Sequence, residues 1–274
     1  MDFEKANTNE YTNIKKVIAI MSGKGGVGKS SVTSLLAVSL IKKGFKVGIL
    51  DGDMGGTSIP KIFGITGEKS NTSSKGIEPV TTPSGIKVMS LSFLMEKEDS
   101  PVIWRGLLIS KTLRQFYTDF LWGDLDYLLI DFPPGTSDLP LTMIHSLPGG
   151  WHNNCFVPAR SCKPGYRARI RNHGHSCMIV KKSADMAKRM DVPILGIIEN
   201  MSYYECPDCK KRINIFGKSK TEKISKEMRI ELIAHMPIDP KLAELCDEGA
   251  IEEYYNINRA LVNLLSDEVL KKLS

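Results

Sequence analysis

Short apolar runs alternate with segments of helical period along most of the chain. The runs that predict strands cover residues 17–21, 46–50, 86–92, 125–130, 192–198 and 231–236. Helical periodicity is clearest over residues 31–42 and 258–273. Because a parallel strand needs a long crossover before the next one, this alternation predicts an α/β fold, a mostly parallel sheet with helices on both faces.

Length and composition fit one domain. The chain has 274 residues, of which 42% are hydrophobic, and this is enough to bury a sizeable core. We therefore interpret residues 1–274 as a single domain that begins with a polar, flexible arm over residues 1–15. No run reaches the roughly 18 apolar residues that span a bilayer, and the first residues lack a signal pattern, so we expect no membrane partner and a cytoplasmic protein.

Residues 148–177 interrupt the alternation. This segment contains three prolines, several Gly and Asn residues, and five cations without an acid. The cations are Arg160, Lys163, Arg167, Arg169 and Arg171. Because burying unpaired charge is costly and proline has no N–H for a ladder, we expect no buried strand here and a sheet that has lost or replaced one strand.

The role of this atypical basic segment stays open between three interpretations. It could be a zinc insertion, although its spacing matches no standard zinc knuckle. The candidate ligands are Cys155, Cys162, His173, His175 and Cys177. It could be a basic RNA-binding loop in which Trp151 and Tyr166 stack on bases. It could also be a locally scrambled stretch between two intact halves.

The first apolar run leads directly into Gly23-x-x-x-x-Gly28-Lys29-Ser30, the pattern of a phosphate-binding loop. In such a loop the glycines let backbone N–H groups turn toward an anion, and a helix N-terminus faces the same point. We expect Lys29 to reach the β- and γ-phosphates of a nucleotide and the Ser30 hydroxyl to ligate Mg²⁺. The expected nucleotide contacts in this loop are Gly23, Gly25, Gly26, Val27, Gly28, Lys29, Ser30 and Ser31.

Two other apolar runs end in acidic residues. The run at 46–50 is followed by Asp51 and Asp53, and the run at 125–130 is followed by Asp131. Since the carboxyl ends of parallel strands form the ligand-binding edge of such a sheet, these acids should lie near the phosphate loop. We predict Asp51 and Asp131 as Mg²⁺ ligands together with Ser30. Asp-Gly-Asp alone could also be a simple turn.

A Cys-x-x-Cys pair, Cys206 and Cys209, lies in the polar segment 200–217, which we interpret as a metal-binding loop. A tetrahedral zinc or a [4Fe–4S] cluster needs four thiolates, and a twofold axis can supply the second pair from another copy of the chain. Both metals accept four thiolates, so the pair alone does not separate zinc from iron. A redox dithiol is a third option, although such pairs usually lie at a helix N-terminus. Cys246 is expected to be a small apolar core residue.

Four separate strings resemble one known family. The strings Lys24-Gly-Gly-Val-Gly-Lys-Ser, Asp51-Gly-Asp and Asp131-Phe-Pro-Pro-Gly, with the Cys-x-x-Cys pair, are similar to the Mrp/ApbC iron–sulfur carrier ATPases of the MinD/ParA group, P-loop NTPases with a deviant Walker A. The resemblance implies that Lys24 crosses a homodimer interface to touch the partner's nucleotide, and that Asp53 orients the attacking water. It also implies that Asn200 recognises the adenine and that Pro237 lies beside the base. The implied catalytic residues are Lys24, Lys29, Asp53 and Asp131.

The function implied by the resemblance is a homodimeric, slow ATPase. It would use ATP and Mg²⁺, carry a dimer-bridging [4Fe–4S] cluster on Cys206 and Cys209, and hand the cluster to apo iron–sulfur proteins. The alternative is a MinD/ParA-like positioning ATPase with a structural zinc at the same cysteines. Since the five cations of residues 148–177 account for all but one unit of the +6 net charge, the rest of the chain gives little support to nucleic-acid binding.

Overall fold

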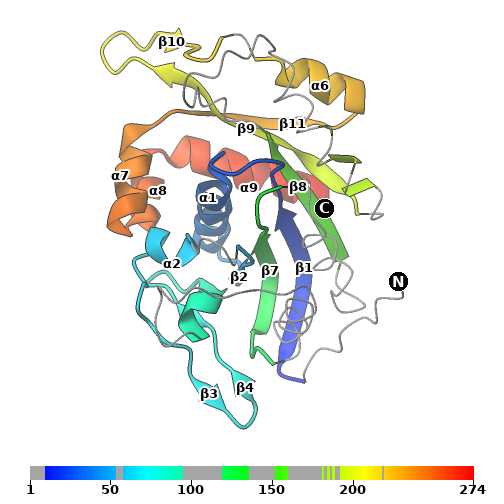
Figure 1. The fold of residues 1–274 in the computed structure, drawn as a ribbon, viewed down its shortest axis with the longest axis vertical. Coiled ribbons are helices and arrows are strands. Elements are labelled where there is room, and N and C mark those ends of the chain that lie inside the picture. The colour runs from blue at the N-terminus through cyan, green and yellow to red at the C-terminus, as the bar shows by residue number, and fades with distance from the viewer. Residues whose placement is uncertain are drawn as a thin grey trace.

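A nine-stranded, mostly parallel sheet forms the centre of the computed structural model (Figure 1). The structure describes residues 10–53, 58–94, 119–135, 152–159, 192–217 and 219–274, together with 181, 184–185 and 187–188. Hydrogen-bonded neighbours follow the order β10-β9-β8-β1-β7-β2-β6-β5, and β11 pairs with β9. All pairings in this sheet are parallel except those of β5 and β10. The predicted α/β fold with a mostly parallel sheet is therefore confirmed.

Six of these strands overlap the predicted apolar runs, and three, β5, β8 and β10, lie outside them. The main sheet contains β1 (Thr12–Ile20), β2 (Val47–Asp51), β5 (Val80–Thr81), β6 (Lys87–Ser90), β7 (Gly123–Asp131), β8 (His152–Ala159), β9 (Ile194–Glu205), β10 (Arg212–Ile213) and β11 (Leu232–Pro237). A small antiparallel pair, β3 (Thr72–Ser73) and β4 (Gly76–Ile77), lies apart from it. The central strands β1, β2 and β7 are almost completely buried where they approach their carboxyl ends, as expected for strands covered on both faces.

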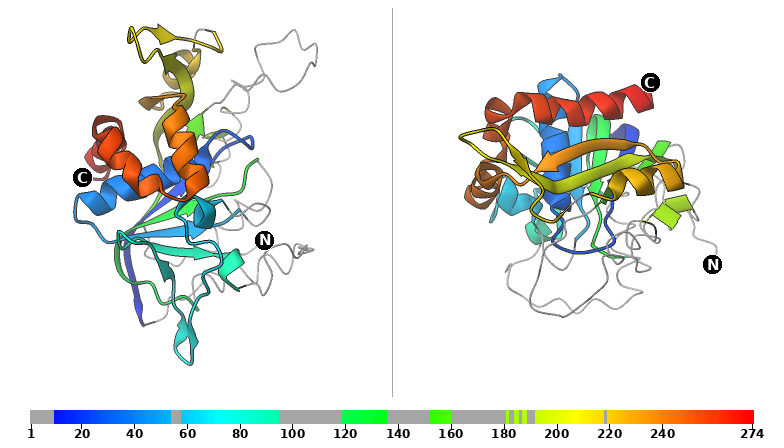
Figure 2. Two further views of the ribbon diagram at one scale, coloured as in Figure 1. Left: turned by 90° about the vertical axis from the view of Figure 1, so that its left-hand side faces the viewer. Right: turned by 90° about the horizontal axis from the view of Figure 1, so that it is seen from above.

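Helices pack on this sheet and on one another. The helical elements are α1 (Lys29–Lys42), α2 (Ile59–Ile62), η1 (Leu91–Leu94), α6 (Thr221–Met228), α7 (Pro240–Glu248), η2 (Ile251–Glu253), α8 (Tyr254–Ile257) and α9 (Arg259–Leu273). Helix α9 lies beside α1, as the two views of Figure 2 show, and the Ser39 hydroxyl donates to Ser266 Oγ at 2.7 Å between them. Helix α9 buries Val262, Leu265 and Val269, so the predicted C-terminal amphipathic helix packs on the protein. None of the helices in the described part of the chain is long and apolar enough to cross a membrane.

The expectation of a lost or replaced strand in residues 148–177 is wrong. Strand β8 occupies residues 152–159 and pairs in parallel with β1 on one side and β9 on the other. The physical reason is local, because none of these eight residues is charged and the five cations begin only at Arg160. The prediction used the composition of the whole segment 148–177. Residues 152–159 alone have a composition that a sheet can accept. The other candidate zinc ligands, Cys162, His173, His175 and Cys177, lie outside the described residues.

The prediction that residues 12–15 belong to a flexible arm is also wrong. Strand β1 begins at Thr12, so residues 12–15 belong to the sheet. Thr12 and Ile14 are buried while Asn13 and Lys15 are exposed, an alternation that the run of polar residues concealed. The Thr12 hydroxyl donates to Phe120 O at 2.9 Å, which fixes the start of the strand.

Candidate functional site

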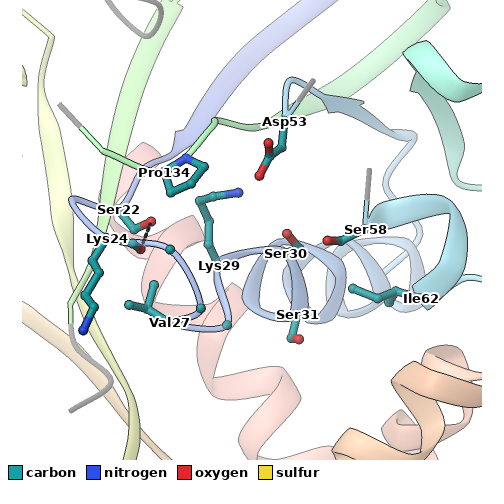
Figure 3. Close-up of a pocket in the computed structure, with 13 residues that line it drawn as sticks. Ser22, Lys24, Val27, Lys29, Ser30, Ser31, Asp53, Ser58, Ile62 and Pro134 are labelled. Atoms are coloured by element: carbon teal, nitrogen blue, oxygen red, sulfur yellow. Dashed lines mark hydrogen bonds between the residues drawn. The ribbon is translucent and has the colours of Figure 1, made fainter. Parts of the chain in front are cut away.

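The loop between β1 and α1 has the backbone conformation of a phosphate cradle (Figure 3). Gly26 and Gly28 have φ of 71° and 77°, a left-handed region that glycine enters without steric cost. Helix α1 begins directly at Lys29, so its unpaired N–H groups and the positive end of its dipole face the loop. The loop thus has the glycine conformations and the helix N-terminus that its sequence pattern predicts.

Contacts from two other strands hold this loop in place. Ser22 O accepts the Gly135 N–H at 2.8 Å, beyond the end of β7. Val27 O accepts a hydrogen bond from Asn200 Nδ2 on β9 at 3.0 Å. A Cβ at position 28 would lie 2.2 Å from that same Asn200 nitrogen, so any larger residue would displace the Asn200 side chain from the loop.

A cavity of about 210 Å³ lies in front of the loop. It is lined by Ser22, Lys24, Gly25, Gly26, Val27, Gly28, Lys29, Ser30, Ser31, Asp53, Ser58, Ile62 and Pro134. The structure therefore gathers most of the predicted nucleotide contacts around one space. Of the remaining three, Gly23 lies in the loop, Asn200 touches the loop from the side of β9, and Pro237 ends β11 and lines a different groove.

Asp131, at the end of β7, is the centre of the polar network behind the cavity. Its Oδ1 accepts from Lys29 Nζ at 2.6 Å and from the Thr33 hydroxyl at 3.0 Å. Its Oδ2 accepts from the Ser30 hydroxyl at 2.6 Å. Lys29 and Asp131 are both buried, so this ion pair is shielded from water, and Lys29 can exchange the carboxylate for an incoming phosphate.

Asp51 lies beside this network at the end of the neighbouring strand β2, in register with Asp131. Burial, followed by the negative charge of Asp131, raises the pKa of Asp51 to about 8. Asp51 also accepts from the Ser90 hydroxyl at 3.3 Å and from the Asp53 N–H at 3.2 Å. Two buried carboxylates thus share one neighbouring ammonium, and this donor set fits a small divalent cation with oxygen ligands.

Asp53 and Lys24 lie at opposite ends of the cavity. The Asp53 carboxylate faces the tip of Lys29 in Figure 3, on the side away from the loop glycines. Lys24 is exposed and its side chain points away from Lys29. Within one chain, therefore, the Lys24 side chain directs its ammonium group away from the cavity.

Cys206 and Cys209 form a turn between β9 and β10, which projects from the body of the protein (Figures 1 and 2). The turn closes with hydrogen bonds from Cys206 N–H to Lys211 O and from Lys210 N–H to Cys206 O, both at 3.0 Å. Backbone N–H groups of Cys209 and Asp208, and the Cys209 side chain, hydrogen-bond to the Cys206 sulfur and hold its pKa below the usual range. Amides directed at a sulfur favour the thiolate, the form that binds metal.

Cys206 and Cys209 place two thiols at this turn. Among the described residues, no group of three or more His, Cys, Asp or Glu side chains is placed to hold a metal ion. Cys246 is half-buried in α7 near Ser31, and burial raises its pKa. It packs against the apolar core, as predicted, and lies on a different element from the cysteine turn.

Comparison with known proteins places the phosphate loop and the cysteine turn in one family. Residues 13–270 match the family model described as ParA, the NUBPL iron-transfer P-loop NTPase. This chain belongs to that family. An iron–sulfur cluster carrier protein of Clostridium perfringens is 43% identical over 257 residues, 91% of this chain and 85% of the relative. The cytosolic Fe-S cluster assembly factor CFD1 of Saccharomyces cerevisiae is 38% identical over 95% of this chain and 87% of its own.

Solved structures agree with the assignment to the iron-transfer P-loop NTPases. A nucleotide-binding protein in complex with ADP from Archaeoglobus fulgidus has a TM-score of 0.72 and 44% sequence identity, and the match covers 88% of this chain and 89% of that one. The cell division ATPase MinD of Pyrococcus furiosus has a TM-score of 0.61 and 20% identity, with coverage of 94% and 99%. The likeness to MinD shows the common fold alone, whereas the iron–sulfur relatives share close to twice that identity.

Some site residues of this iron-transfer P-loop NTPase escaped the sequence analysis. They are Ser22, Thr33, Ser58, Ile62, Ser90 and Pro134. Thr33 carries a usable signal, since it lies one helical turn after Lys29 and so must face the same strand end. The contact of Ser90 with Asp51 could not be predicted without the strand order, because the pairing of β6 with β2 creates it.

Proposed function

We propose that this protein is a homodimeric ATPase that carries an iron–sulfur cluster and delivers it to apoproteins. One observation supports this function above the others: the exposed cysteine turn lies at the end of β9, the strand whose Asn200 touches the phosphate loop. The names of the relatives point in the same direction. We place the protein in the cytoplasm, in line with the cytosolic relative from yeast.

The nucleotide chemistry follows from the cavity. Ser30, Asp51 and Asp131 would hold Mg²⁺, which offsets the charge of the phosphates. Lys29 leaves Asp131 to bind the β- and γ-phosphates, and Asp53 orients the water that attacks the γ-phosphorus. The new P–O bond forms as the bond to the β-phosphate oxygen breaks, which yields ADP and phosphate. Asn200 and Pro237 are proposed to contact the base.

In this proposal a second copy of the chain completes both the nucleotide site and the metal site. The exposed Lys24 reaches the nucleotide of the partner chain, where its charge acts in the manner of an arginine finger. Cys206 and Cys209 from two chains supply four thiolates, the number that a [4Fe–4S] cluster requires. The cluster is cargo, so the turn must bind it and also release it, and its exposure at the tip of a hairpin supports both steps.

Variants of single cysteines test cluster carriage. We expect the Cys206→Ala protein, reconstituted anaerobically with iron and sulfide, to bind no stable cluster and to activate no apoenzyme that depends on a [4Fe–4S] cluster. Cys246→Ala is the matched control and should load and deliver like the wild type, because Cys246 packs against the core in α7. Iron, acid-labile sulfide and apoenzyme activation are measured. A full cluster in Cys206→Ala, or zinc without sulfide in anaerobically purified wild type, would overturn the proposal.

A further inference from the structure

Strand β9 has a different partner on each of its faces. Its neighbouring residues Glu199 and Asn200 must point in opposite directions, as successive residues of a strand do. Asn200 donates to Val27 O of the phosphate loop. The strand continues to Glu205, and Cys206 follows immediately, so only residues 201–205 separate the loop contact from the first thiol.

A bulge in β9 lies at the phosphate loop. Glu199 pairs with His235 of β11, and Tyr203 pairs with Pro237, so β9 contains two more residues than β11 between the same two pairings. Within the bulge Met201 has φ of 53°, a left-handed conformation that is uncommon outside glycine. The Asn200 side chain supports it by accepting the Met201 N–H at 2.9 Å, while its amide nitrogen holds Val27 O. A change in the phosphate loop therefore acts on β9 at its least regular point.

The opposite face of β9 holds the segment that leads away from the cysteine turn. The Glu199 carboxylate is 3% exposed, and the Ser219 hydroxyl lies 2.8 Å from each of its oxygens. His235 Nδ1 lies 2.7 Å from Glu199 Oε2. Ser219 Oγ also accepts the Thr221 N–H at 3.0 Å, which fixes it at the start of α6. The chain that leaves the turn through β10 is thus tied back to the strand that enters it.

We propose that Glu199 and Ser219 are positioning residues that clamp the outgoing limb of the cysteine hairpin to β9. Because the incoming limb is β9 itself, a shift of β9 at the phosphate loop then moves Cys206 and Cys209 together. Two links join the outgoing limb to β9: the pairing of β10 with β9 next to the turn, and the contact of Ser219 with Glu199 beyond it. Loss of the second link lets the segment after β10 lag behind β9, which weakens the dependence of the sulfur spacing on the nucleotide. This inference rests on the proposed function, to which it adds the route between its two halves.

The reactivity of the cysteine thiols in the cluster-free protein tests the clamp. We expect Mg-ATP to change the rate at which iodoacetamide alkylates Cys206 and Cys209 by about fivefold or more, the usual lower range of coupling between two sites. In Ser219→Ala this ratio should fall toward one, with ATP affinity unchanged. Ser219→Thr keeps the hydroxyl and should restore the response, which a merely structural role of the side chain would not require.

Ser225→Ala is the matched control for the clamp. Ser225 lies in α6, and its hydroxyl donates to Ile230 O at 2.6 Å, beyond the C-terminal end of the helix, so this variant should respond to Mg-ATP like the wild type. A wild-type nucleotide response in Ser219→Ala, or no response in the wild type itself, would overturn the clamp. Cluster loading is measured separately, so that a protein that loads and delivers its cluster but shows no thiol response contradicts only this inference, and a protein that binds ATP but no cluster contradicts only the proposed function.

Discussion

ATP hydrolysis by Asp131→Asn is expected to fall by roughly 100-fold or more, the usual cost of removing a preorganised group from a charged transition state. The Asp131 carboxylate accepts from Lys29, Ser30 and Thr33 at once. An asparagine offers one acceptor oxygen, and its NH₂ group would face donors. The substitution also removes one of the two carboxylates that would hold Mg²⁺. Phosphate release measured against Mg²⁺ concentration checks the prediction.

Asp126→Asn is the control, because it makes the same chemical change on the same strand. Asp126 lies in the N-terminal half of β7, away from Asp131 at the C-terminal end, and its carboxylate pairs with the exposed Lys15 ammonium at 2.7 Å. Because this ion pair is exposed to solvent, it contributes little to stability, so this variant should keep wild-type hydrolysis and nearly wild-type stability. Equal loss of hydrolysis in both variants would show that the effect comes from a damaged sheet instead of the site.

Two inactive variants should regain activity when mixed. Lys24→Ala lacks the lysine that is proposed to act on the partner's nucleotide, and Asp53→Asn lacks the carboxylate that is proposed to orient water in its own site. In a mixed dimer, the Lys24→Ala chain keeps its own Asp53 and receives Lys24 from its partner. Random pairing makes half of the dimers mixed, each with one complete site, so hydrolysis should recover to about a quarter of the wild-type rate.

The mixing experiment also distinguishes action of Lys24 on the partner's nucleotide from action on the nucleotide of its own chain. If Lys24 acted on its own nucleotide, neither chain of the mixed dimer would hold a complete site and no activity would return. Lys43→Ala is the control for loss of a lysine, since Lys43 lies at the far end of α1 and pairs with Asp267 at 2.7 Å. It should hydrolyse ATP at the wild-type rate.

The sequence is sufficient for the parts of the site that are local in the chain. The phosphate loop, its preceding strand and its following helix are contiguous, so Gly28, Lys29 and Ser30 are predictable together. Asp51 and Asp131 are predictable because each ends an apolar run, and parallel strands bring such ends to one edge.

The parts that the sequence did not predict depend on contacts between distant segments. Asn200 holds Val27 across 173 positions, and nothing near Asn200 in the chain indicates the bulge that puts it there. Strand β8 was not predicted because the segment considered was too long. The charged residues after Ala159 dominated the composition of residues 148–177, although none of them lies in the strand. Charged residues argue against a buried strand only when they lie within the strand itself, and the register of the pairing decides which residues do so.

The stoichiometry of the metal centre tests most directly whether two chains complete one site. After anaerobic reconstitution with Mg-ATP, mass measurement and analysis of iron and acid-labile sulfide should give a dimer with about four irons and four sulfides per two chains, and none in Cys206→Ala. A single chain that stays monomeric while it holds both ATP and a complete cluster would contradict this account.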